Sequence, residues 1–143
     1  MRSYLIVANE TLASPTLAAA VADRISSGDA SFHVVVPATP IQHGLTWDEA
    51  EAQAAASERL AAVLVRLRAL GAEASGEVGS KDPVAAVRDA LREREADEII
   101  LSTLPVGISR WLGQDVPTRM KNAVRVPVVV VTAVRDTEPA TNG

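Results

Sequence analysis

Apolar and polar residues occur in blocks along the chain that predict strands and helices in turn. Continuous apolar runs, typical of strands buried on both faces, occupy 4–8 (YLIVA), 31–36 (SFHVVV), 98–102 (EIILS) and 127–132 (PVVVVT). The segment 72–78 instead alternates small and polar residues, which predicts a short strand at a sheet edge. We therefore expect five strands.

Helical spacing of apolar residues fills the intervals between these strands. Ser14-Pro15 and Asp82-Pro83 each provide an N-cap followed by a first-turn proline. A capping box at 46–49 (TWDE) opens the longest helix, which we expect to end at Gly71, and a short helix is expected over 116–124. Strict alternation of strands and helices predicts an α/β fold with three layers, a doubly wound parallel sheet with helices on both faces.

Composition limits the class of protein and of partner. The chain of 143 residues is 48% hydrophobic, which is enough for one domain over 1–134, and the polar segment 135–143 is expected to be a mobile tail. A net charge of −4 argues against nucleic acid as a partner. The first apolar run is too short for a secretory signal or a membrane span, so we expect a cytoplasmic protein without a membrane partner.

The sequence lacks the motifs of common nucleotide-binding and hydrolytic enzymes. No glycine-rich loop ends in Lys-Ser/Thr, and Asn9 begins the segment where a Rossmann fold would need G-x-G-x-x-G. The two histidines, His33 and His43, fall in a strand and a loop without the spacing of metal ligands, and there is no cysteine. Gly107-Ile108-Ser109 is not the G-x-S-x-G of hydrolases, and no histidine follows it. We expect neither a metal site nor a catalytic site.

The segment 103–115 (TLPVGISRWLGQD) is the strongest candidate for a ligand site. It follows a buried strand and precedes a helix, where ligands collect in parallel α/β sheets and helix N-termini offer N–H groups to anions. Ser109 and Arg110 supply a hydroxyl and a guanidinium that suit an anion. Asp115 opposes this, because as an N-cap it would occupy the same N–H groups.

A purely structural interpretation of this segment stays open. Trp111 would then pack the loop against the sheet, and Gly107 and Gly113 would serve only as turn glycines. Arg110 would pair with a nearby carboxylate rather than with a ligand. Both interpretations place the segment at the same edge of the sheet.

The layout resembles that of the universal stress protein family over about residues 2–133. The features that carry the resemblance are LIVA at 5–8, IILST at 99–103, the glycine-containing loop that follows, and PVVVV at 127–131. The resemblance implies the fold of that family, which is also described as adenine-nucleotide-hydrolase-like, with strand order 3-2-1-4-5. ATP-binding members carry Gly-x-x-Gly, nine residues and then Gly-Ser/Thr in this loop, and usually an aspartate after the first strand.

That nucleotide motif is degraded in this chain. Ser102 and Pro105 occupy the positions of the first two glycines of the motif, and Gly113-Gln114 occupies the position of its final pair. Asn9 replaces the aspartate that usually follows the first strand. Proline has no N–H and a fixed φ, so Pro105 disfavours a phosphate cradle built from backbone. The resemblance implies a non-catalytic domain that binds a small ligand, with ATP or another adenine nucleotide as one candidate. The expected contacts are Ala8, Asn9, Thr11, Pro37, Ser102, Thr103, Gly107, Ser109, Arg110, Gly113, Gln114 and Asp115.

The last predicted strand is the candidate dimer edge. In the implied order it lies at the side of the sheet, although its composition is that of a protected strand, and such an edge aggregates unless something pairs with it. The resemblance implies a homodimer that uses Pro127, Val128, Val129, Val130 and Val131. The alternative function is a structural or interaction module that dimerises through this edge and binds no nucleotide.

Overall fold

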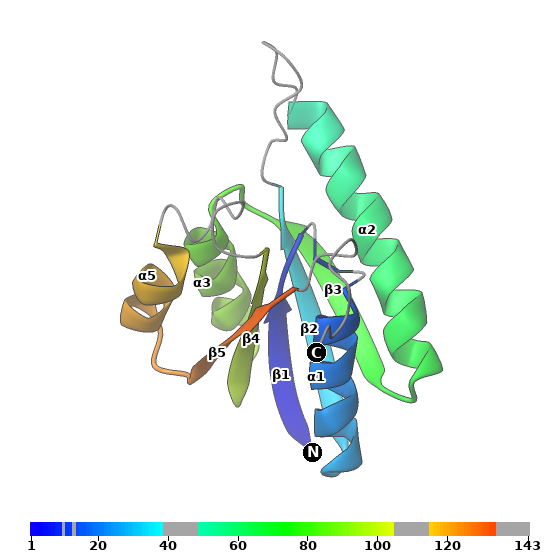
Figure 1. The fold of residues 1–143 in the computed structure, drawn as a ribbon. Helices are drawn as coiled ribbons and strands as arrows, with labels where there is room; N and C mark the ends of the chain where they lie inside the picture. Colours follow the sequence, from blue (N-terminus) through cyan, green and yellow to red (C-terminus); the bar gives the residue numbers. More distant parts are fainter. Residues whose placement is uncertain (10, 13, 39–48, 105–114, 134–143) are drawn as a thin grey trace, which may run out of the picture.

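Five parallel strands form one sheet in the computed structural model of the chain, which describes residues 1–9, 11, 12, 14–38, 49–104 and 115–133 (Figure 1). The order β3-β2-β1-β4-β5 confirms both the predicted parallel sheet and the order that the resemblance implied. Its switch point, where the direction of strand addition reverses, lies between β1 and β4. The strands are β1 (Arg2–Val7), β2 (Ala30–Pro37), β3 (Glu73–Gly79), β4 (Glu98–Thr103) and β5 (Val128–Thr132).

Helices cover both faces of this sheet, which confirms the three layers. One face packs against α1 (Pro15–Ser26) and α2 (Glu49–Ala69), and the other against α3 (Pro83–Glu93) and α5 (Val116–Ala123) (Figure 1). Successive residues of a strand point to opposite faces, so Ile6 enters the first core and Leu5 the second. This is why the central strands are apolar at every position. Among the described helices, none is long and apolar enough to cross a membrane.

The starts of α1 and α3 and the end of α2 follow the predicted signals. The Ser14 hydroxyl accepts a hydrogen bond from the Thr16 N–H at 3.1 Å, and the Asp82 carboxylate accepts one from the Ala85 N–H at 3.2 Å. Gly71 follows α2 with φ 92°, a conformation that favours glycine. The capping box begins at residue 46, which lies outside the described residues, as does the predicted tail.

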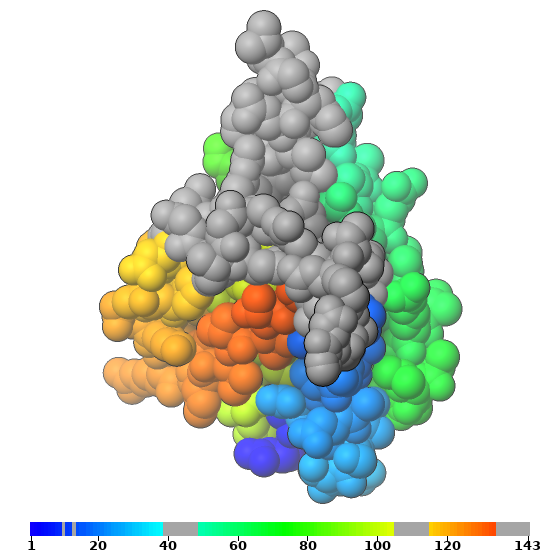
Figure 2. Space-filling model, in the orientation of Figure 1, coloured from blue at the N-terminus to red at the C-terminus, as the bar shows by residue number. Residues whose placement is uncertain are grey.

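The two edges of the sheet are β3 and β5, as expected. β3 has small residues because α2 and β2 approach it closely. A Cβ atom at Gly76 would lie 2.5 Å from Leu60 Cδ1 and 2.8 Å from the Val34 carbonyl oxygen. At the other edge, Figure 2 shows β5 at the surface between α5 and α1.

Candidate functional site

Polar residues converge where β1, β2 and β4 end. The Asn9 side-chain amide donates a hydrogen bond to the Pro37 carbonyl at 2.7 Å, which ties the end of β1 to the end of β2. The Thr11 hydroxyl lies 2.7 Å from the Ser102 hydroxyl and donates to the Ser102 carbonyl at 3.2 Å, which ties the loop after β1 to β4. The second connection crosses the switch point, the place where ligands bind in open α/β sheets.

These residues are buried, so they serve first to fix the strand ends. Thr11 is 4% exposed and Asn9 6%, and each satisfies its side chain within the cluster. Thr103 is different, because its hydroxyl is buried and has no hydrogen-bond partner among the described residues. Among the described residues, the carboxyl edge of the sheet therefore holds one buried hydroxyl, that of Thr103, without a hydrogen-bond partner. The structure brings together six of the expected contacts here, namely Ala8, Asn9, Thr11, Pro37, Ser102 and Thr103.

Arg59 of α2 joins this cluster, although it is not among the contacts predicted from the sequence. Its guanidinium donates to the side-chain oxygen of Asn9. Arg59 is half-buried, and none of the ion pairs between described residues includes it. Because an amide is neutral, the positive charge of Arg59 is not neutralised by this partner. The position of Arg59 on the helix indicates that it faces the sheet. It lies three residues after Ala56 and four before Val63, and both of these are buried on the sheet.

Asp115 does not cap α5 in the predicted way. It stands at the N-cap position, but its carboxylate makes no capping hydrogen bond, and its φ of 56° is left-handed instead of extended. The extended conformation is the one that directs a side chain to the N–H groups of the first turn. The second helical residue is Pro117, which has no N–H to offer.

The remaining expected contacts lie outside the described residues and stay predictions. They are Gly107, Ser109, Arg110, Gly113 and Gln114. Within the described part of the chain, no group of three histidine or acidic side chains is placed to hold a metal ion.

Comparison with solved structures identifies the fold. No protein-family model matches the sequence, and no curated protein matches it. A universal stress protein family member from Burkholderia pseudomallei superposes with a TM-score of 0.63 at 18% identity, covering 90% of this chain and 93% of that one. A universal stress protein family protein from Arabidopsis thaliana with AMP bound superposes with a TM-score of 0.68 at 10% identity, covering 99% of this chain and 97% of that one. The universal stress protein of Archaeoglobus fulgidus in complex with dAMP superposes with a TM-score of 0.58 at 18% identity, covering 92% of this chain and 98% of that one. The chain therefore has the universal stress protein fold that its sequence pattern resembled.

Proposed function

We propose that this chain is a non-catalytic domain that binds an adenine nucleotide at the carboxyl ends of β1, β2 and β4. The observation that carries this proposal is the contact between Arg59 and Asn9 beside the switch point. A guanidinium bound to a neutral amide, and to no carboxylate among the described residues, keeps its charge for a phosphate.

Proteins of the same fold support the class of ligand. The Arabidopsis thaliana protein was solved with AMP and the Archaeoglobus fulgidus protein with dAMP. In the family pattern an aspartate stands near the position of Asn9. Here the amide leaves that position neutral, and Arg59 adds positive charge beside it. We infer that the phosphate, more than a backbone cradle, anchors a nucleotide in this chain.

The arrangement of the hydroxyl groups favours binding without catalysis. At this edge, the Thr11 and Ser102 hydroxyls bond to each other, and Thr11 also bonds to backbone. A nucleophilic hydroxyl would instead be bonded to a general base such as histidine or a carboxylate.

We further propose that the domain is a homodimer paired through β5. This strand is at the sheet edge, and its side chains from Val128 to Val131 are only half-buried. An apolar edge strand is stabilised when a second strand pairs with it. The alternative is that dimerisation is the whole function and that no nucleotide binds.

Isothermal titration calorimetry with AMP, ATP and adenosine tests the ligand. We expect AMP to bind, and Arg59→Gln to weaken AMP about tenfold, because a charge-assisted hydrogen bond to phosphate is lost. Adenosine has no phosphate, so the variant should leave its affinity unchanged. Arg88→Gln, which removes an exposed arginine on α3, is the matched control. If neither nucleotide binds at millimolar concentration, the interaction module becomes the better description.

A further inference from the structure

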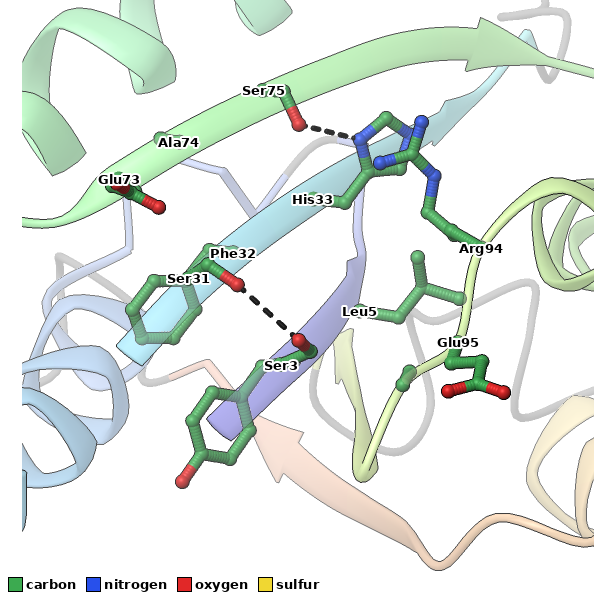
Figure 3. Close-up of a pocket in the computed structure, with 12 residues that line it drawn as sticks. Ser3, Leu5, Ser31, Phe32, His33, Glu73, Ala74, Ser75, Arg94 and Glu95 are labelled. Carbon is green, nitrogen blue, oxygen red and sulfur yellow. Dashed lines mark hydrogen bonds between the residues drawn. The ribbon is translucent and has the colours of Figure 1, made fainter. Parts of the chain in front are cut away.

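A second polar hollow of about 370 Å³ lies on the face of the sheet that α3 covers, but at the amino ends of the strands. It forms because small side chains occupy this face in three adjacent strands. Ser3 is paired with Ser31, and His33 with Ser75, so their side chains lie side by side. The segment 94–96, which leads from α3 into β4, closes one side. The residues that line the hollow are Ser3, Tyr4, Leu5, Ser31, Phe32, His33, Glu73, Ala74, Ser75, Arg94, Glu95 and Ala96 (Figure 3).

The charged side chains of this hollow have no ion-pair partner among the residues that the structure describes. Glu73, Arg94 and Glu95 line it, and none of them belongs to an ion pair between described residues. Arg94 Nε is moreover buried without a hydrogen-bond partner in the described structure. Figure 3 shows Glu73 at one end, the Arg94 guanidinium beside His33, the Ser3 and Leu5 side chains in the middle, and the Glu95 carboxylate directed away from Arg94. Such a separation of unpaired charges suits a ligand that carries both signs.

His33 adds hydrogen bonding to the hollow without adding charge. Its Nδ1 lies 2.8 Å from the Ser75 hydroxyl. Burial and the adjacent Arg94 charge lower the pKa of His33 below its ordinary value, although Glu77, 3.3 Å from Nε2, and Glu93 act in the opposite direction. The imidazole is therefore neutral at pH 7. Arg94 remains the one cation of the lining, against two carboxylates, which makes the lining net negative by one charge.

Other small ligands fit these groups less well. A simple anion would meet two carboxylates for one guanidinium, and a simple amine would leave Arg94 unpaired. Sugars bind against aromatic rings, but the rings of Tyr4 and Phe32 stack on each other in the core of the opposite face. A basic amino acid has one carboxylate and two ammonium or guanidinium groups, so its net charge of +1 complements the lining.

We propose that this hollow binds a free basic α-amino acid such as lysine, ornithine or arginine. The carboxylate pairs with Arg94, and the net negative charge of the lining, to which Glu95 contributes, attracts the α-ammonium. The side chain extends toward Glu73, past Ser3 and Ser31. The neighbouring strands β1, β2 and β3 span about 10 Å, a distance that an extended basic side chain can follow. The cavity lies near the lower end of the range of small-molecule pockets, about 300–1,000 Å³, so it suits a ligand of this size.

Calorimetric titration of the full chain with L-lysine tests this proposal, using three compounds that each lack one charge. Norleucine lacks the ε-ammonium, Nα-acetyl-lysine lacks the α-ammonium, and cadaverine lacks the carboxylate. We expect lysine to bind, and each of the three to bind about tenfold more weakly or not at all. If lysine, ornithine and arginine all fail to bind, or if cadaverine binds as tightly as lysine, the proposal is wrong.

Variants of the protein locate the site. Arg94→Gln and Glu73→Gln should each weaken lysine binding about tenfold. The control is Arg92→Gln, which removes an exposed arginine that lines a neighbouring hollow of about 580 Å³ but not this one. Lysine should also shift the backbone amide resonances of Ser31, Ala74 and Ser75. Binding that survives both variants, or shifts elsewhere, would overturn the proposed location. The ligand comparison on the unaltered protein decides the question even if a variant fails to fold.

This test is independent of the proposed nucleotide site. Arg94→Gln should leave AMP affinity unchanged, and Arg59→Gln should leave lysine affinity unchanged, because the two residues lie at opposite ends of the strands. Failure of one ligand to bind therefore says nothing about the other.

Discussion

The hydroxyl of Thr11 lies 2.7 Å from the hydroxyl of Ser102, a residue 91 positions later in the chain. This contact joins the loop after the first strand to the end of the fourth, and so holds the switch point of the sheet together. Both side chains are buried, and each is the other's side-chain partner. A buried hydroxyl that loses its partner keeps the cost of its own dehydration.

Thr11→Val therefore destabilises the fold more than its small change in shape suggests. Valine keeps the shape of threonine but leaves the Ser102 hydroxyl unpaired. We expect the free energy of unfolding to fall by about 1–3 kcal/mol, measured by urea denaturation.

A double-mutant cycle separates the pair from other effects of the substitution. Ser102→Ala alone should also destabilise, but Thr11→Val combined with Ser102→Ala should cost less than the sum of the two, because no unpaired hydroxyl remains. Strictly additive costs would show that the two hydroxyls contribute independently.

Gly76 is required in β3 because a methyl group there has no room. The added Cβ would overlap the Leu60 side chain and the Val34 carbonyl oxygen. Gly76→Ala should lower the free energy of unfolding by about 1–3 kcal/mol, measured by thermal or denaturant unfolding. In a Leu60→Ala background the added cost should shrink but not vanish, because the backbone oxygen of Val34 remains. An unchanged or increased stability would contradict the close packing of α2 on β3.

His33 makes stability depend on pH in a defined direction. Its folded-state pKa is lowered, chiefly by burial and then by Arg94, from an ordinary value of 6.5. The unfolded chain therefore takes up this proton at a higher pH than the folded chain. As pH falls below 6.5 the unfolded state binds more protons, and the free energy of unfolding decreases until the folded-state pKa is passed.

His33→Gln provides the comparison, because glutamine does not titrate. We expect the unaltered protein to lose stability as the pH falls below 6.5, in denaturant titrations at fixed ionic strength, and the variant to lose less. The measured quantity is the slope of the free energy of unfolding against pH. A constant difference in stability between the two proteins therefore does not affect the result. Equal slopes would mean that the pKa of His33 is the same in the folded and unfolded chains.

The sequence predicted the sheet well because its strands are buried on both faces. Leu5 and Ile6 enter different cores, so the whole run had to be apolar, and such a run stands out without knowledge of the fold. The predicted first strand began two residues late, because Arg2 and Ser3 are polar but still pair with Ala30 and Ser31. The sequence signal follows burial, whereas strand pairing depends on the backbone.

The candidate site was harder to predict because its contacts depend on tertiary placement. Asn9, Thr11 and Ser102 were expected near one another from the ends of their strands, but nothing local indicated which of them would bond. The Arg59 contact depends on how α2 lies on β2 and β3, from where the Arg59 side chain reaches Asn9. The hydrogen bond between His33 and Ser75 depends on the register of β2 and β3. The helical spacing of Arg59 indicates that it faces the sheet, but no spacing in the sequence indicates that its partner is Asn9 or that the partner of His33 is Ser75.

Thr132→Pro tests whether the open edge of β5 forms the dimer. The Ala133 N–H donates to the Thr103 carbonyl at 2.8 Å. Donors alternate in direction along a strand, so the Thr132 N–H points away from β4, toward the open edge of the sheet. Thr132 is exposed, and proline is tolerated on an edge strand where its missing N–H would face outward. We expect the monomer to stay folded and the dimer dissociation constant to rise about tenfold or more, measured by sedimentation velocity.

Thr132→Ala is the matched control, because alanine shortens the exposed side chain but keeps the N–H. Its dissociation constant should equal that of the unaltered protein. If proline and alanine have the same small effect on a dimer, pairing occurs through another surface. If the unaltered protein sediments as a monomer at every concentration, the half-buried valines of β5 do not support a dimer, and the nucleotide site must then be complete within one chain.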